Sequence, residues 1–385
     1  MRRLICGLLI LAAALSLTGC AALFDREYYV IEEYEAPSEQ TEPDEDAADT
    51  ISNYAALRRA IVRLVSEHAE SAQLQFQNYD GAISQDISTA CWEVKSSTAL
   101  GAFAVDYISY DLSRIVSYYQ AEIFITYKRA AWQVDAIEKA ANAAALSARL
   151  GEALRGDETY LVLELSSAAV TGDTARDAVV RAYYADPLLC PVLPTVETNV
   201  FPDSGVDRIL EISLDYGTDS ETLALRRTEL SDALGEMSEV LPDGTAADGE
   251  RLEALCGYLA SVCTVAPEAG STAWDALTQG EADSEGAAMA FEAGCRAMGY
   301  DCVTVTGRMD GEPHFWNIVA IGGGSYHVDV SSRDAEEQVF LLGDEALLSL
   351  GYWWDNSEYP VCASTYDPAA DDASEEPDAS GEPNL

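Results

Sequence analysis

Hydrophobic residues recur at helical spacing in several stretches of the chain. Tyr54, Leu57, Ile61, Leu64 and Val65 stand mostly three or four positions apart, which predicts a helix over 52–72. The Ala-rich run 134–154 has high helix propensity and predicts a second helix. Further helices are expected over 173–185, 220–236 and 250–265.

Strand-like patterns alternate with these helices. They occupy 73–76, 121–128, 159–167 and 208–217. No phosphate loop or Gly-rich dinucleotide fingerprint accompanies them, and no internal repeat is visible. We therefore expect residues 51–240 to form one α+β domain of unknown role, which serves as a scaffold or binds a partner.

A break at 241–245, which reads Leu-Pro-Asp-Gly-Thr, separates this region from a second one at 245–363. The second region predicts a helix over 285–300 and strands over 302–307, 314–320 and 325–330. His314 opens the middle strand, and Asp329 lies in the last one. If the Gly-rich turn between them has two or four residues, both side chains share one face of the sheet and can hydrogen-bond.

The stretch 272–362 resembles the transglutaminase-like core of the papain-type superfamily. The resemblance covers about a quarter of the chain. It is carried by Ala273, Ala276, Leu277, Gly286, Ala288, Phe291, Gly299, Tyr300, Cys302, Gly307, His314, Trp316, Asn317, Val319, Tyr326, Val328 and Asp329. It implies an α+β fold with a helix packed on an antiparallel sheet. It also implies catalytic positions at 284, His314 and Asp329, with Trp316 and Asn317 at the cleft.

Ser284 stands where that family carries its catalytic cysteine. A helix N-terminus and an imidazolium can hold a thiolate, but they cannot hold a serine hydroxyl as a resting anion. The negative charge of Asp283 would also oppose a developing oxyanion. Ser284 or Asp283 could instead cap the helix. We therefore expect Ser284, His314 and Asp329 to form a vestigial or weak triad.

The first residues read MRRLICGLLILAAALSLTGC. A basic start, a short apolar run and Leu-Thr-Gly-Cys resemble a bacterial lipoprotein signal over 1–19, with Cys20 lipidated. The protein would then sit at the outer face of the bacterial cytoplasmic membrane. Residues 20–50 and 364–385 are rich in Glu, Asp, Pro and Ser, which predicts disordered acidic segments.

Acidic residues dominate the composition, with 67 Asp and Glu against 22 Lys and Arg, a net charge of −45. Such a chain repels nucleic acid, so we exclude that class of partner. No C-x-x-C motif or neighbouring histidine indicates a metal site, and no cofactor is expected. Disulfides are permitted outside the cytoplasm, but their pairing is left open.

Two functions from different classes follow from these features. The first is a lipid-anchored pseudoenzyme that binds a peptide or a cell-wall ligand or acts as a scaffold. The second is an acyltransferase or peptidase that uses Ser284, His314 and Asp329 as a serine triad. A solute-binding lipoprotein is a weaker third, because the chain lacks the repeated α/β halves that such a protein would need.

Overall fold

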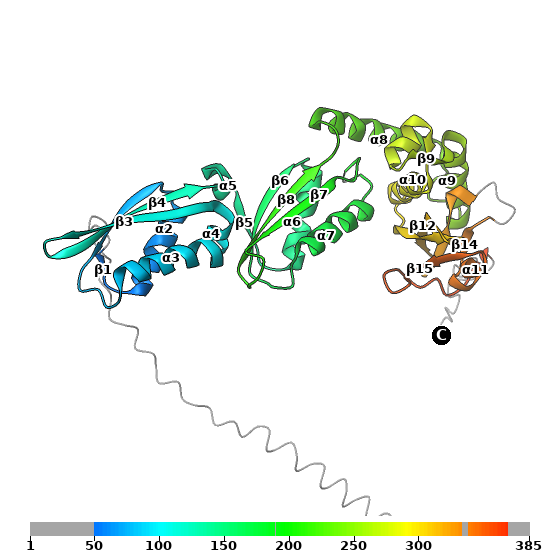
Figure 1. Ribbon diagram of the computed structural model, residues 1–385. Coiled ribbons are helices and arrows are strands. Elements are labelled where there is room, and N and C mark those ends of the chain that lie inside the picture. The colour runs from blue at the N-terminus through cyan, green and yellow to red at the C-terminus, as the bar shows by residue number, and fades with distance from the viewer. Residues whose placement is uncertain (1–49, 189, 333–337, 369–385) are drawn as a thin grey trace, which may run out of the picture. The chain divides into compact units, whose positions relative to one another are not determined.

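The computed structural model describes residues 50–188, 190–332 and 338–368. The expected signal peptide with Cys20, nearly all of the tether and most of the acidic tail lie outside the described residues. None of the helices in the described ranges has the length and hydrophobicity needed to cross a bilayer. The chain is α+β, as expected, and Figure 1 shows its helices and sheets.

The first module, residues 50–127, is a four-stranded sheet covered by helices. Its helix α2 is capped by Asn53, whose side chain accepts a hydrogen bond from the Ala56 amide, and it buries Leu57, Ile61 and Leu64, as the spacing predicts. The strands run in the order β1-β2-β4-β3, with only β1 and β2 parallel. The elements are β1 (Thr50–Ile51), α2 (Tyr54–Ser66), β2 (Ser71–Phe76), α3 (Ile83–Ser97), α4 (Ala99–Ala104), β3 (Val105–Ile115) and β4 (Tyr118–Tyr127).

The second module, residues 137–215, repeats this topology. Its strand order is β5-β6-β8-β7, again with the first two strands parallel and the remaining pairs antiparallel. The short helix α5 (Ala131–Asp135) precedes it. The elements are β5 (Ile137–Ala140), α6 (Ala143–Arg155), β6 (Tyr160–Leu165), α7 (Gly172–Ala185), β7 (Thr195–Phe201) and β8 (Arg208–Asp215). Residues 51–240 therefore contain a structural repeat that the sequence does not display.

The helix predicted over 134–154 is wrong in its first half. Ile137–Ala140 forms β5, which pairs with β6, and the buried Ala140 faces the core. The helix α6 begins only after Asn142, whose side chain accepts a hydrogen bond from the Ala145 amide. Pairing with β6 outweighs the helix propensity of these residues. Asn142 is a typical N-cap residue, and it marks where the helix begins.

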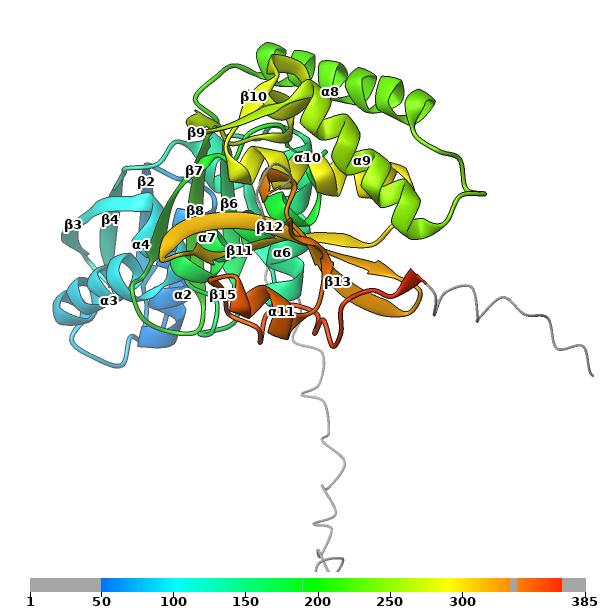
Figure 2. The ribbon, with the colours of Figure 1, turned by 90° about the vertical axis from the view of Figure 1, so that its right-hand side faces the viewer.

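The C-terminal domain, residues 248–366, contains a five-stranded sheet in the order β14-β13-β12-β11-β15, with antiparallel pairs throughout. In Figure 2 helix α10 lies on one side of this sheet and α11 on the other. Helix α8 (Ser220–Val240) precedes the domain. Its elements are α9 (Asp248–Val262), β9 (Thr264–Gly270), η2 (Asp275–Gln279), β10 (Glu281–Ala282), α10 (Ser284–Ala297), β11 (Cys302–Met309), β12 (Glu312–Ile321), β13 (Gly324–Val328), η3 (Val330–Ser332), β14 (Phe340–Leu342), α11 (Asp344–Ser349) and β15 (Tyr352–Trp354). A helix on an antiparallel sheet is the arrangement expected for this region.

Helix α10 is the central element of this domain. Asp283 caps it by accepting a hydrogen bond from the Gly286 amide, and every residue from Gly286 to Cys295 is buried. A methyl group on Gly286 would lie 2.9 Å from the Gly270 and Thr272 carbonyl oxygens. The glycine therefore allows the first turn of α10, which carries Ser284, to approach the preceding segment closely.

Candidate active site

The β12–β13 hairpin sets the positions of the two predicted polar residues. Its turn consists of Gly322 and Gly323, with φ angles of 55° and 79°, and Ile321 pairs with Gly324. The turn thus has two residues, so His314 and Asp329 lie on one face of the sheet. His314 Nε2 is 2.8 Å from Asp329 Oδ2, and both residues are buried.

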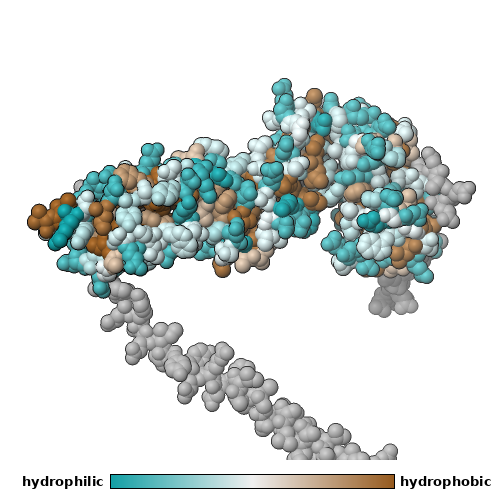
Figure 3. Space-filling view, in the orientation of Figure 1, coloured by the Kyte–Doolittle hydropathy of each residue, from teal (hydrophilic) through white to brown (hydrophobic). Residues whose placement is uncertain are grey.

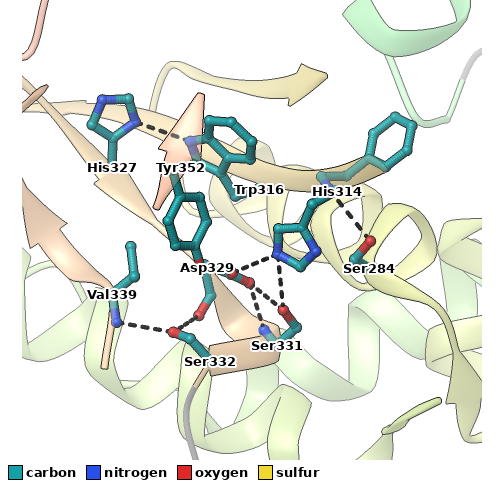
Figure 4. Close-up of polar contacts among 10 residues, drawn as sticks. Ser284, His314, Trp316, His327, Asp329, Ser331, Ser332, Val339 and Tyr352 are labelled. Carbon is teal, nitrogen blue, oxygen red and sulfur yellow. Dashed lines mark hydrogen bonds and ion pairs between the residues drawn. The ribbon is translucent and has the colours of Figure 1, made fainter. Parts of the chain in front are cut away.

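Asp329 is held by several donors at once. Tyr352 Oη donates to Oδ2 at 2.6 Å, while the Ser331 amide and hydroxyl donate to Oδ1 at 2.8 and 2.6 Å. Burial alone would raise the pKa of this carboxyl group, but the bonds from His314, Ser331 and Tyr352 outweigh it, so the net shift is downward. Asp329 is therefore a charged, fixed acceptor that orients the imidazole of His314 (Figure 4).

Ser284 is the first residue of α10 and is partly exposed. Its hydroxyl does not cap the helix, because Asp283 does so. Ser284 Oγ instead accepts a hydrogen bond from the Phe315 amide at 3.4 Å, which places it beside the backbone of His314. Figure 4 shows the imidazole between Asp329 and Ser284. Within the described residues, the Ser284 hydroxyl makes no hydrogen bond with that imidazole.

Two carboxyl groups flank Ser284 in the sequence. Asp283 is fully engaged, since its second oxygen accepts a hydrogen bond from Ser271 at 2.6 Å. Glu285 accepts a hydrogen bond from Tyr184 Oη at 2.8 Å, and burial raises the pKa of its carboxyl group. Neither group donates to the space beside Ser284, so neither offers obvious stabilisation to an oxyanion there.

Trp316 and Asn317 do not line a cleft, contrary to the expectation from the sequence. Both are fully buried. The Trp316 ring packs against Tyr352 and Trp354, and Asn317 donates a hydrogen bond from Nδ2 to the Ala288 carbonyl oxygen of α10 at 2.9 Å. They belong to the two layers that support β12, because adjacent residues of a strand between two covered faces are both buried.

His327, Asp344 and Cys362 form a second polar cluster behind Trp316, with potential ligand atoms within 4.8 Å of one another. The indole nitrogen of Trp316 can only donate, so His327 Nδ1 accepts its hydrogen bond at 3.0 Å. Nε2 must then carry the proton and donate to Asp344 Oδ1 at 2.9 Å. A metal ion would need an unprotonated Nε2, and burial raises the pKa of the Cys362 thiol to about 12. The cluster is therefore a hydrogen-bond network that supports Trp316.

A cavity of about 320 Å³ adjoins the His314–Asp329 pair. Ser331, which contacts both members of the pair, forms part of its wall. Ala287 also lines the cavity and lies about one helical turn from Ser284. The rest of the lining includes Leu259, Cys263, Val265 and Ala290. Ser331 therefore connects the wall of this cavity to the pair.

Sequence reasoning missed Ser331, Tyr352 and Tyr184 as neighbours of the site. Ser331 follows Asp329 by two residues, and a serine at that spacing is a signal for a local bond to the Asp carboxylate. Tyr352 and Tyr184 come from β15 and α7, and no local pattern links either to position 329 or 285. None of the seven cysteines in the described ranges takes the place of Ser284 at the start of α10.

Comparisons with known proteins add little to this geometry. No protein-family model matches the chain, and no curated protein matches it. A solved structure of a TGase is similar at 12% identity and a TM-score of 0.28, over 64% of this chain and 68% of that one. A candidate cysteine protease from Cytophaga hutchinsonii is similar at 10% identity and a TM-score of 0.24, over 44% and 69%. At these TM-scores neither likeness supports a functional conclusion.

Proposed function

We propose that the protein is a membrane-anchored extracytoplasmic lipoprotein whose C-terminal domain binds a peptide or a cell-wall ligand without turning it over. In this proposal the domain keeps the transglutaminase-like arrangement of histidine and aspartate but lacks the thiol. The observation that carries the proposal is the hydrogen bonding of Ser284. Its hydroxyl accepts from the Phe315 amide and has no bond to the His314 imidazole within the described residues.

The chemistry of serine explains why this bonding supports the proposal. A serine hydroxyl becomes a nucleophile only when a base removes its proton during the attack. A thiol at the same place could be stored as a thiolate by the helix and the imidazolium before any substrate arrives. With serine, the pair of His314 and Asp329 remains assembled but has no stored nucleophile to serve.

The remaining groups suit the binding of an amide-containing ligand. The lining of the cavity includes small side chains such as Ala287 and Ala290, and Ser331 links its wall to the His314–Asp329 pair. Concave pockets that carry placed polar groups are typical of ligand sites. A peptide segment or a peptide linked to a polysaccharide matches this lining.

The test is an assay of the purified full chain for amine incorporation into glutamine and for peptide hydrolysis. We expect no rate above that of the matched variants Ser284→Ala and His314→Ala. A wild-type rate that both substitutions abolish would overturn the proposal and show a working serine triad.

One observation favours acyl transfer or hydrolysis by Ser284 as a second candidate. Asp283 supplies the helix cap, so the Ser284 hydroxyl is partly exposed and is not needed for capping. Catalytic hydrogen bonds are often long in ligand-free enzymes and shorten on binding. A fluorophosphonate probe distinguishes the two candidates, because it would label Ser284 only if His314 activates it.

The membrane anchor has its own test. Leu17, Thr18, Gly19 and Cys20 follow an apolar run in the sequence, which supports lipidation of Cys20. Radiolabelled fatty acid should be incorporated into the wild-type chain and not into Cys20→Ala. Equal labelling of both proteins would contradict the anchor.

A further inference from the structure

A groove of about 400 Å³ lies in the first module, between helix α3 and strand β3. It is far in sequence from the residues around His314 and serves no part of the function proposed above. The helix contributes Ser88, Cys91, Trp92 and Lys95, and the strand contributes residues 107–110. The groove thus lies between a helix and an edge strand of the sheet.

Strand β3 is the outer strand of its sheet and is 11 residues long. It pairs with β4 on one side, and no backbone hydrogen bond reaches its other side from any part of the chain that the structure describes. Natural proteins usually shorten, cover or interrupt such edges, because a free row of N–H and C=O groups recruits another strand. β3 has a bulge between Val105 and Tyr107 but continues regularly beyond it.

The side chains of the groove are unusual for a surface. Trp92 is 66% exposed and Tyr107 is 61% exposed, and such residues are enriched at binding interfaces. Lys95 follows Trp92 by three residues and so lies on the same face of α3. Among the described residues Lys95 has no ion pair, in a chain with about three acidic residues for each basic one.

The second module has an equivalent helix, α7, and an equivalent edge strand, β7. The two are in contact, as α3 and β3 are through Ser88 and Tyr110. Arg176 Nη1 donates to Thr198 Oγ1 at 2.7 Å, and a methyl group on Gly172 would lie 2.3 Å from that oxygen.

We propose that this groove binds an extended peptide with an acidic group, which adds to the free edge of β3. Backbone hydrogen bonds to β3 would hold the peptide, as in other cases of strand addition to a sheet edge. Trp92 and Tyr107 would cover an apolar side chain, and Lys95 would pair with a carboxylate. The far end of the same strand is also apolar at the surface, where Ile115 and Val116 are exposed (Figure 3).

Two features favour a peptide over a saccharide. Only an extended peptide complements a row of free backbone donors and acceptors along β3. The hydroxyl groups that could bind a sugar are partly engaged already, because Tyr110 Oη bonds to the hydroxyl group of Ser88 at 2.9 Å and donates to the Ser84 carbonyl oxygen at 3.0 Å. A saccharide is therefore treated as an alternative outcome.

The test selects ligands for the full chain from a library of random decapeptides displayed with free carboxyl ends. Selected peptides are expected to carry an acidic group and to slow amide hydrogen exchange in residues 107–115. Lys95→Ala should weaken their binding about tenfold, the usual effect of one charge-assisted contact. Trp92→Ala should weaken it at least as much. N-methylation of alternate peptide residues, which blocks strand pairing, should abolish it.

The chain offers matched controls for both substitutions. Trp132 is as exposed as Tyr107, and Lys139 is also exposed, but neither lines the groove. Trp132→Ala and Lys139→Ala should leave the binding unchanged. Failure to enrich any peptide over a Trp92→Ala, Lys95→Ala double variant would overturn the proposal. So would selected peptides that tolerate N-methylation, or binding of chitotetraose with no peptide selected.

Discussion

The hydrogen bond from Trp316 fixes the protonation state of His327. The Trp316 indole nitrogen donates to Nδ1, so a second proton on the ring would meet another donor. Burial lowers the pKa of His327 below its ordinary value of 6.5, and the bond to Asp344 only partly opposes this shift. The folded protein therefore holds His327 neutral, and this supports the packing of Trp316 next to His314.

This leads to a prediction about stability and pH. The unfolded chain binds a proton at His327 near pH 6.5, but the folded chain does so only at lower pH. The contribution of His327 is thus complete above pH 6.5 and is lost as the pH falls below that value, by at most about 1.4 kcal/mol per pH unit. Urea unfolding of the wild type at pH 7 and 5.5 should show this loss.

His327→Gln is the control for that measurement. Glutamine keeps a donor and an acceptor but does not titrate in this range. The variant should lose less unfolding free energy than the wild type between pH 7 and 5.5. Equal losses in the two proteins would mean that the pKa of His327 is the same in the folded and unfolded chain. The assigned tautomer would then be wrong.

The sequence predicts the central residues of the site but not their surroundings. His314 and Asp329 could be paired because two adjacent strands and a Gly-rich turn define which side chains share a face. Ser331 and Tyr352 complete the bonds to Asp329, and Tyr352 arrives from a strand more than twenty residues later. The family resemblance places Trp316 at a cleft, and the sequence does not show that both faces of β12 are covered.

At the scale of elements, the position of Ser284 depends on how closely the first turn of α10 packs. A methyl group on Gly286 would lie 2.9 Å from two carbonyl oxygens and from the Ala282 side chain. Since backbone atoms cannot move aside easily, we expect Gly286→Ala to lower the unfolding free energy by about 1–3 kcal/mol. Urea unfolding at neutral pH measures this change.

Gly235 in α8 provides the matched substitution. A methyl group there meets no atom within 4 Å, so Gly235→Ala should raise the unfolding free energy by roughly 0.5–1 kcal/mol through higher helix propensity. Equal stabilisation of both variants would show that a methyl group fits at position 286. Gly286 would then not be needed to position Ser284.

The elements themselves were predictable where the pattern was local and strong. Helix α2 matches its apolar spacing, and β11, β12 and β13 fall where the sequence places strands. The sequence does not predict strands β1, β3, β5, β7, β9, β10, β14 and β15. Each lies at the edge of a sheet, where only one side is paired and less apolar surface is buried, so the hydrophobic pattern is weaker.

At the scale of the whole molecule, the buried residues fall into separate groups. One core belongs to the first module alone, while another runs through both the second module and the C-terminal domain. A small third cluster contains residues of both modules, namely Phe103, Ala104, Val162 and Ile209. The two copies of the repeated topology therefore differ. The first has its own core, and the second shares its core with the domain that carries the candidate site.

This division predicts two thermal transitions. Ile61→Ala, in the first core, and Leu210→Ala, in the shared core, each truncate a fully buried side chain and should cost about 2–5 kcal/mol. In differential scanning calorimetry each substitution should shift mainly one transition. A single transition that moves equally with both substitutions would show that residues 50–366 unfold as one cooperative unit.

The most direct test of the central claim is the reactivity of a thiol introduced by Ser284→Cys. If position 284 is the nucleophile position of an assembled site, His314 and the start of α10 will lower the pKa of that thiol. Peptide-resolved mass spectrometry can follow its labelling by iodoacetamide at pH 6 apart from the native cysteines. We expect labelling about tenfold faster than in the Ser284→Cys, His314→Ala double variant. Equal rates in both variants, rising with pH as for an ordinary thiol, would contradict the claim.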